Sequence, residues 1–177
     1  MVKRQSSKVV YETPFVKVFE DEVEYDNGVK GVYSYLERRN FSSIIPYTGH
    51  SFILVKQYRY PIQQFSIEFP AGSHQAEPKM DPLKLAAAEL QEETGYSADK
   101  FVRVGAVHTA PGSFTSTFTV FVATGLHPGK QKLDLEEAGL EILEIPTAEF
   151  EQMLRDNKIQ DGPTLAGYGL AKARGII

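Results

Sequence analysis

The chain has 177 residues, 42% of them hydrophobic and 24% charged, a composition typical of a soluble globular domain with its own core. It contains no cysteine, which excludes disulfides, thiolate nucleophiles and zinc–sulfur sites, and its net charge of −4 argues against nucleic acid or an anionic membrane as the main partner. No signal-peptide pattern opens the sequence and no segment approaches the roughly 18 apolar residues of a membrane span, so we expect a cytoplasmic protein.

The first forty residues are rich in alternating, β-branched and aromatic residues, which indicates antiparallel strands. We expect strands at residues 9–12, 16–25 and 29–38, with a hairpin turn at 26–28 between the last two. These strands predict an N-terminal β subdomain within residues 1–40. Because no linker follows it, we expect one domain over residues 1–177.

The rest of the chain mixes strand and helix patterns. Strands are expected at 42–47, 51–58, 64–69, 101–109, 118–125 and 140–145. Helices are expected at 82–94, 147–157 and 163–174. The first helix has the clearest boundaries, because Asp81 is a good N-cap, Pro82 suits the first helical position and Gly95 stops the helix.

The helix at 82–94 is expected to pack on a sheet through one apolar face. The residues predicted for that face are Leu83, Ala86, Ala87, Leu90 and Thr94. Alanines at positions 86–88 would permit a close approach to the sheet.

Three carboxylates, Glu89, Glu92 and Glu93, converge on one side of this helix because they lie three and four residues apart. No lysine or arginine lies between residues 85 and 95, and like charges at this spacing cost about 0.2–0.5 kcal/mol per pair. A hard divalent cation with oxygen ligands is the simplest source of positive charge. The alternative is a solvated acidic face, although such a face usually includes lysine four residues away.

These residues resemble a known family. Residues 89–96 (ELQEETGY) match the second half of the Nudix box at every specified position, and Gly72 matches its first glycine. Residues 55–61 and 68–72 (EFPAG) resemble the approach to the box in ADP-ribose pyrophosphatases. Pro111 and Gly112 lie where that subfamily has its proline, and residues 157–165 are also similar, so the resemblance covers most of the chain.

Two departures from the box concern its internal brace. Ala88 replaces the box arginine, and the loop from Gly72 to Ala88 is two residues longer than the pattern, so Glu77 is only the nearest counterpart of the first box glutamate. In the family these two residues are understood to pair. Since losing both leaves no stranded charge, we interpret the change as a structural replacement.

The resemblance implies an α/β/α Nudix sandwich with a mixed sheet and an N-terminal antiparallel β extension. It also implies Mg²⁺-dependent hydrolysis, with Mn²⁺ as a possible substitute, of the pyrophosphate bond of ADP-ribose or a related nucleoside diphosphate sugar. The products would be a nucleoside monophosphate and a sugar phosphate. Glu89, Glu93 and the carbonyl of Ala71 would be metal ligands, and Glu92 would bind a second ion or orient the ligands, which makes it a candidate catalytic residue.

The base that activates water in this subfamily often comes from a loop outside the box. The matching loop here is 134–139, in which the spacing to the next strand favours Glu136 as general base, with Glu137 as the alternative. Closure of such a loop over substrate would exclude bulk water. An ordinary solvated acidic loop is the other interpretation.

Four residues are candidates for substrate contacts. Arg59 could bind a phosphate through its guanidinium fork, although a surface ion pair would account for it nearly as well. Glu68 lies in the motif that precedes the box. Pro111 and Gly112 could shape the sugar pocket or simply form a hairpin connection.

Members of the family commonly dimerise through their N-terminal sheets, so we expect a homodimer that binds a nucleotide sugar, without nucleic acid or membrane partners. The alternative from a different functional class is a Nudix-fold module that senses a nucleotide without cleaving it. Ala88 and the altered loop support that alternative. The presence of all expected metal carboxylates favours the enzyme.

Overall fold

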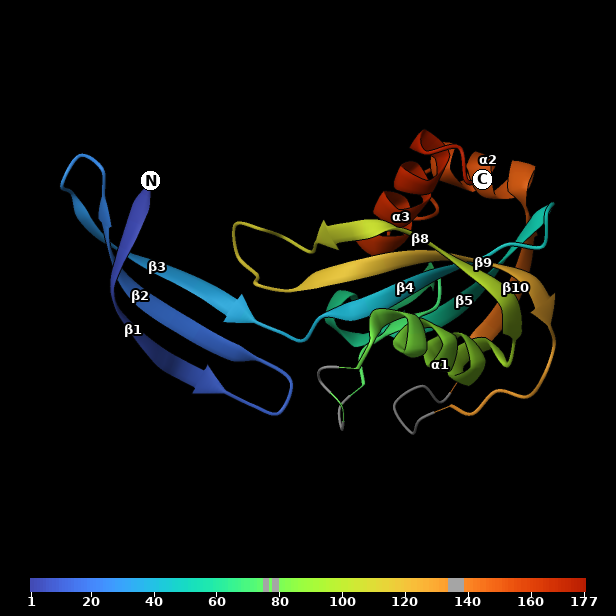
Figure 1. The fold of residues 1–177 in the computed structure, drawn as a ribbon, viewed down its shortest axis with the longest axis horizontal. Coiled ribbons are helices and arrows are strands. Elements are labelled where there is room, and N and C mark those ends of the chain that lie inside the picture. Colours follow the sequence, from blue (N-terminus) through green and yellow to red (C-terminus); the bar gives the residue numbers. More distant parts are fainter. Residues whose placement is uncertain (75–76, 78–79, 134–138) are drawn as a thin grey trace. The chain divides into compact units, whose positions relative to one another are not determined.

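The structure is a computed structural model that describes residues 1–74, 77, 80–133 and 139–177. The chain forms two compact units (Figure 1). The N-terminal unit comprises residues 1–40 and 108–117, and the second unit comprises residues 41–107 and 118–177. Nothing in the sequence pointed to residues 108–117 as part of the first unit. The expectation of one domain over the whole chain stays a prediction.

The N-terminal unit contains a three-stranded antiparallel sheet in the order β1-β2-β3. Its strands are β1 (Val2–Glu12), β2 (Lys17–Tyr25) and β3 (Lys30–Glu37). The predicted meander is confirmed, but β1 starts at residue 2 instead of residue 9. The early residues lack an apolar alternation and are held by cross-strand polar pairs such as Lys8 with Glu20, whose Nζ and Oε1 atoms are 2.6 Å apart.

The second unit holds two sheets. One has the order β10-β5-β6 with antiparallel pairing, and the other has the order β7-β4-β9-β8, in which β4 and β9 are parallel. The strands are β4 (Phe41–Pro46), β5 (Ser51–Arg59), β6 (Gln64–Glu68), β7 (Ala71–Gly72), β8 (Ser97–His108), β9 (Thr117–His127) and β10 (Glu141–Pro146). A short 3₁₀ turn, Tyr60–Ile62, follows β5.

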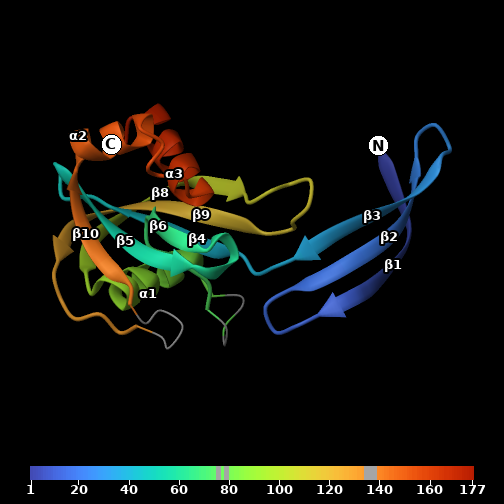
Figure 2. The ribbon, with the colours of Figure 1, turned by 180° about the vertical axis from the view of Figure 1, so that it is seen from behind.

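Among the described residues of this unit, three helices cover the sheets: α1 (Pro82–Thr94), α2 (Thr147–Arg155) and α3 (Gly162–Ala173). Both views show α1 on one side of the sheets and α2 with α3 on the other (Figure 1 and Figure 2). None of the helices in the described residues is both long and apolar enough to cross a membrane.

Neighbouring residues of β4 belong to two different hydrophobic clusters. Ile44 clusters with Leu90 of α1, whereas Ile45 clusters with Phe150 of α2 and Tyr168 of α3. Because successive side chains of a strand point to opposite faces, the sheet is buried on both sides. The predicted α/β/α sandwich with a mixed sheet is confirmed.

Helix α1 begins and ends where the sequence predicted. Asp81 Oδ1 accepts hydrogen bonds from the backbone amides of Leu83 and Lys84, and Gly95 leaves the helix at φ +74°. Its predicted packing face was wrong in part, because Leu83 is 45% exposed and Ala87 is exposed as well. The buried residues are Leu85, Ala86, Glu89, Leu90, Glu93 and Thr94. The helix is therefore turned so that two glutamates enter the buried face.

Candidate active site

The 68–72 segment, which runs from the end of β6 through β7, is the centre of the site. Each of its five residues is held by a residue of a neighbouring element. Glu68 pairs with Arg59 of β5, Phe69 N donates to Thr164 of α3, Pro70 O accepts from Ile44 N of β4, Ala71 N donates to Glu93 of α1, and Gly72 lies against Glu89 of α1. The backbone of this segment is thus fixed by four elements.

Two carboxylates of α1 reach the end of the segment. Glu93 is 3% exposed, and its Oε2 accepts a hydrogen bond from Ala71 N at 3.3 Å. Glu89 is 7% exposed, and its carboxylate lies so close to Gly72 that a Cβ there would be 2.6 Å from Glu89 Cδ. Gly72 therefore leaves space that the Glu89 carboxylate occupies. The structure places Ala71 beside Glu93 and Gly72 beside Glu89, and the predicted role of these residues as metal ligands stays a prediction.

The last turn of α1 is capped by residues that follow β9. Gln131 Nε2 donates to Glu93 O at 2.7 Å, and Lys132 N donates to Glu92 O at 3.0 Å. A Cβ at Gly95 would lie 2.9 Å from Gln131 N, so this approach requires glycine. These donors satisfy carbonyl groups that have no partner within the helix. The turn that carries Glu92 and Glu93 is therefore fixed at its C-terminal end.

Arg59 forms a two-point ion pair with the buried carboxylate of Glu68. Arg59 Nε donates to Oε1 at 2.9 Å, Nη2 donates to Oε2, and Gln57 Nε2 donates to Oε2 at 3.4 Å. The hydrogen bond with Glu68 raises the pKa of Arg59 above its ordinary value, against the effect of burial, and the charges of Glu68, Asp161 and Glu93 raise it further. The structure shows an ion pair, although with a buried carboxylate instead of at the surface, and the phosphate contact stays a prediction.

Helix α3 reaches the same segment from the other side of the sheet. Thr164 is fully buried, and its Oγ1 accepts a hydrogen bond from Phe69 N at 2.9 Å. Asp161 caps the helix through a hydrogen bond from Thr164 N to its Oδ2 at 2.8 Å. Burial raises the pKa of Asp161 above its ordinary value, as does the charge of Glu68, while the hydrogen bonds with Thr164 and the charge of Arg59 oppose this.

The donor set fits a hard divalent cation. Carboxylate and carbonyl oxygens are the ligands that Mg²⁺ and Mn²⁺ accept. Within the described residues, no group of three or more His, Cys, Asp or Glu side chains could hold a metal ion. Mg²⁺ needs fewer, because it usually takes one or two carboxylates and keeps several waters. The buried carboxylates of Glu89 and Glu93 would supply such a smaller set, to which the resemblance adds the carbonyl of Ala71, and metal binding here stays a prediction.

Comparisons with known proteins found pyrophosphatases among the relatives of the chain. No protein-family model matches the chain. The chain is 26% identical over 164 residues to an ADP-ribose pyrophosphatase of Bacillus subtilis (strain 168), covering 92% of this chain and 88% of the relative. It is 27% identical over 165 residues to a methanol dehydrogenase activator of Bacillus methanolicus, with the same coverage. It is 26% identical over 165 residues to a GDP-mannose pyrophosphatase of Yersinia enterocolitica, covering 86% and 84%.

The fold is also similar to a solved structure, described as the crystal structure of an ADP compounds hydrolase. The TM-score is 0.86 at 22% identity, over 99% of this chain and 97% of that one. The resemblance to Nudix hydrolases of the ADP-ribose pyrophosphatase type is confirmed. The expected enzyme class, a Nudix pyrophosphohydrolase, is confirmed with it.

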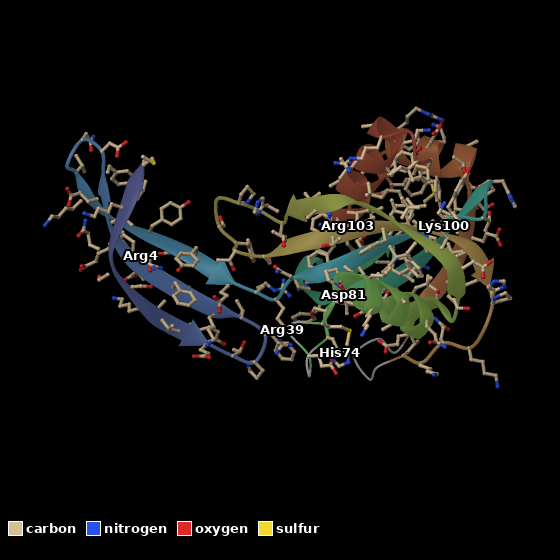
Figure 3. All side chains as sticks on the ribbon, in the orientation of Figure 1. Arg4, Arg39, His74, Asp81, Lys100 and Arg103 are labelled. Carbon is tan, nitrogen blue, oxygen red and sulfur yellow. The ribbon has the colours of Figure 1, made fainter. Side chains whose placement is uncertain are left out.

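The two departures from the Nudix box can be located. Ala88 is half-buried on α1. Glu77 N donates to His74 Nδ1 at 3.1 Å, and Met80 N donates to Glu77 O at 3.0 Å, so the described part of the longer loop has hydrogen bonds of its own (His74 is labelled in Figure 3). The interpretation of the two departures as a structural replacement stays a prediction.

Other predicted site residues belong to the N-terminal unit or lie outside the described residues. Pro111 and Gly112 belong to the N-terminal unit, where Gly112 O accepts a hydrogen bond from the Tyr33 hydroxyl at 2.8 Å. Their proposed role in a sugar pocket stays a prediction. Glu136 and Glu137 lie outside the described residues, and their assignment as general base also stays a prediction.

Sequence reasoning did not predict Thr164 or Asp161 as part of the site. Residues 157–165 were noted only for their family resemblance. The available signal was a hydroxyl residue three positions after an N-cap aspartate, which by itself indicates only the start of a helix. The contact between Thr164 and Phe69 joins residues 95 positions apart. It depends on tertiary packing that no local pattern encodes.

Proposed function

We propose that the chain hydrolyses the pyrophosphate bond of ADP-ribose or a related nucleoside diphosphate sugar in a reaction that depends on Mg²⁺ or Mn²⁺. The observation that carries this proposal is the meeting of Glu89 and Glu93 with the backbone of Ala71 and Gly72. Relatives named ADP-ribose pyrophosphatase and GDP-mannose pyrophosphatase support this substrate class. The products are a nucleoside monophosphate and a sugar phosphate.

In this proposal Glu89, Glu93 and the Ala71 carbonyl hold the cation, and Glu92 holds a second ion or orients these ligands. The bound cation neutralises pyrophosphate charge and lowers the pKa of water. The burial of both carboxylates favours this role, because the attraction between a carboxylate and a cation is stronger away from water than at an exposed surface. We also assign Arg59 a contact with a phosphate, and its hydrogen bond with Glu68, which fixes the direction of the guanidinium, supports this role.

A carboxylate outside the box acts as general base in the proposed mechanism. It takes a proton from water as the water oxygen attacks phosphorus and the bridging phosphorus–oxygen bond breaks. We assign this role to Glu136, with Glu137 as the alternative. Glu136→Gln should lower the turnover number at least about a hundredfold with little change in metal affinity. A near-normal rate in this variant would move the role to Glu137, which the matched Glu137→Gln variant measures.

We further propose that the enzyme is a cytoplasmic homodimer that pairs through the N-terminal unit. Several large apolar side chains of its sheet are exposed, among them Val9, Val10, Tyr11, Val32 and Tyr33. Apolar surface of this kind supports an interface between copies of the chain. Light scattering of the purified chain tests the proposal, since a monomer at micromolar concentration would contradict it.

The experiment that tests the function is a substrate panel. The protein is incubated with Mg²⁺ and nucleoside diphosphate sugars that include ADP-ribose and GDP-mannose, and phosphate is measured after a phosphatase is added. Turnover that stops on chelation of the metal supports the enzyme. Tight binding without turnover on any member of the panel would instead support a nucleotide-sensing module, the alternative that the named hydrolase relatives do not favour.

A further inference from the structure

The backbone of Phe69 and Pro70, between β6 and β7, is held by hydrogen bonds with α3 and β4. Pro70 has no amide hydrogen, so its backbone can form hydrogen bonds only through its carbonyl. This carbonyl accepts from Ile44 N at 2.9 Å. Phe69 is 1% exposed, and its amide must find a partner inside the protein. That partner is the hydroxyl of Thr164, at 2.9 Å.

Thr164 is well placed to hold this amide in one position. Its side chain has no exposed surface, and it lies in the first turn of α3, where its own amide donates to Asp161 at 2.8 Å. Because threonine is β-branched and its χ1 is restricted, the buried hydroxyl oxygen has little freedom to move relative to the helix. A displacement of Phe69 would be passed through the rigid ring of Pro70 to Ala71, because proline fixes φ near −65°.

Ala71 makes the contact with α1, two residues after the contact of Phe69 with α3. Its amide donates to Glu93 of α1, and its carbonyl is the ligand proposed above. The hydrogen bond between Phe69 and Thr164 therefore lies two residues from the proposed metal ligand set. The hydroxyl that accepts this hydrogen bond belongs to α3, which lies outside the residues of the Nudix box.

We propose that Thr164 is a positioning residue of the metal site. It acts through the amide of Phe69, and so sets the position of Ala71, whose amide donates to Glu93 and whose carbonyl is the proposed ligand. The inference rests on the proposed function, because it assigns α3 a part in the same cation site. It differs from a purely structural role in one respect: loss of the hydroxyl should weaken cation binding more than loss of stability alone can account for.

The test measures Mn²⁺ binding to the full chain by electron paramagnetic resonance of the free ion, beside turnover and thermal unfolding. Thr164→Val removes the hydroxyl at nearly constant shape. Thr164→Ser keeps the hydroxyl. Ile159→Val is the control. Ile159 is 1% exposed and belongs to the same hydrophobic cluster as Phe69, and among the described hydrogen bonds its side chain makes none with the 68–72 segment.

We expect Mn²⁺ affinity to fall about tenfold to a hundredfold in Thr164→Val, the usual effect of removing a group that orients a metal ligand. Thr164→Ser should restore it to within about threefold, since the acceptor is retained. Ile159→Val should lower the unfolding temperature without weakening Mn²⁺ binding. Unchanged affinity in Thr164→Val, or an equal loss in the Ile159 control, would overturn the positioning role.

Two further outcomes need to be distinguished: a wild type without function, and a Thr164→Val variant that does not fold. A wild type that neither binds Mn²⁺ nor turns over substrate overturns the proposed function and the inference together. If Thr164→Val does not fold, Thr164→Cys, a weaker acceptor of similar size, is compared with Thr164→Ser. Affinity in the order Ser above Cys supports the positioning role, and equal affinity in both overturns it.

Discussion

Helices α1 and α3 begin in the same way and serve the 68–72 segment in different ways. Each has an aspartate N-cap and a proline in its first turn: Asp81 with Pro82, and Asp161 with Pro163 (Asp81 is labelled in Figure 3). Helix α1 then brings two buried carboxylates to the segment. Helix α3 brings one buried hydroxyl, that of Thr164.

The difference shows that a local signal sets the start of a helix but not its task. Glu89 lies in the middle of α1 and Glu93 in its last turn, and both contact the segment from the side of the helix. Thr164 lies in the first turn of α3 and meets the segment at the helix end. One helix supplies charge and the other supplies position, so variants in the two should affect different measured quantities.

The largest expected effect comes from removing charge on α1. Glu93→Gln keeps an oxygen that can accept from Ala71 N but removes the negative charge. We expect turnover to fall about 10²–10³-fold, because neutralising phosphate charge is worth several kcal/mol and each ~1.4 kcal/mol is a factor of ten. The fold should persist, since one of two neighbouring like charges is lost.

Steady-state turnover with saturating Mg²⁺ measures this effect. Glu149→Gln, on the exposed first turn of α2, is the matched control and should leave the rate unchanged. The loss in Glu93→Gln should also exceed that in Thr164→Val. The opposite order would break the assignment of charge to α1 and position to α3.

A smaller effect is expected from adding one methyl group at the contact with α1. In Gly72→Ala the new Cβ would lie 2.6 Å from Glu89 Cδ, so the carboxylate must move. Because that carboxylate is the end of a flexible side chain, the free energy of unfolding should change little. Metal affinity should fall about tenfold, as for other displaced ligands.

The control for this variant lies on α3. Gly169 is exposed within the helix, and a Cβ there would meet nothing within 4 Å. Gly169→Ala should therefore stabilise the protein by about 0.5–1 kcal/mol without changing metal affinity. Chemical denaturation and Mn²⁺ titration of both variants measure the two quantities. Equal metal affinities in the two variants would remove Glu89 from the site.

The contrast between the helices also marks what the sequence could reveal. The bounds of α1 followed from Asp81, Pro82 and Gly95, because capping chemistry acts within a few residues. The carboxylate group followed from helical spacing for the same reason. The contact of Thr164 with Phe69 could not be predicted, since it requires β6 and α3 to be placed first.

The errors have a similar physical origin. Leu83 and Ala87 were expected in the core, but α1 is turned so that Glu89 and Glu93 are buried instead. A pattern of apolar residues cannot predict the burial of carboxylates whose partners come from another part of the chain. The early start of β1 was missed because its polar residues are held by pairing across to β2.

The smallest effect separates the two N-cap aspartates by pH. The pKa of Asp161 is raised, mainly by burial, so the folded chain keeps this proton to a higher pH than the unfolded chain does. Below the ordinary pKa of 3.8 both states are protonated. As the pH rises above 3.8 toward the raised value, the unfolded state ionises first and stability falls.

Asp161→Asn should remove this dependence while keeping the cap, because asparagine and aspartate are similar N-cap residues. The stability of the variant relative to wild type should therefore rise with pH over that interval and then level off. Asp81→Asn makes the same substitution at the exposed start of α1 and serves as the control. Urea unfolding from pH 3.5 to pH 7 measures both profiles. If they coincide, neither the burial of Asp161 nor the charge of Glu68 raises the pKa of this carboxyl, and the link between α3 and the site rests on the Thr164 hydroxyl alone.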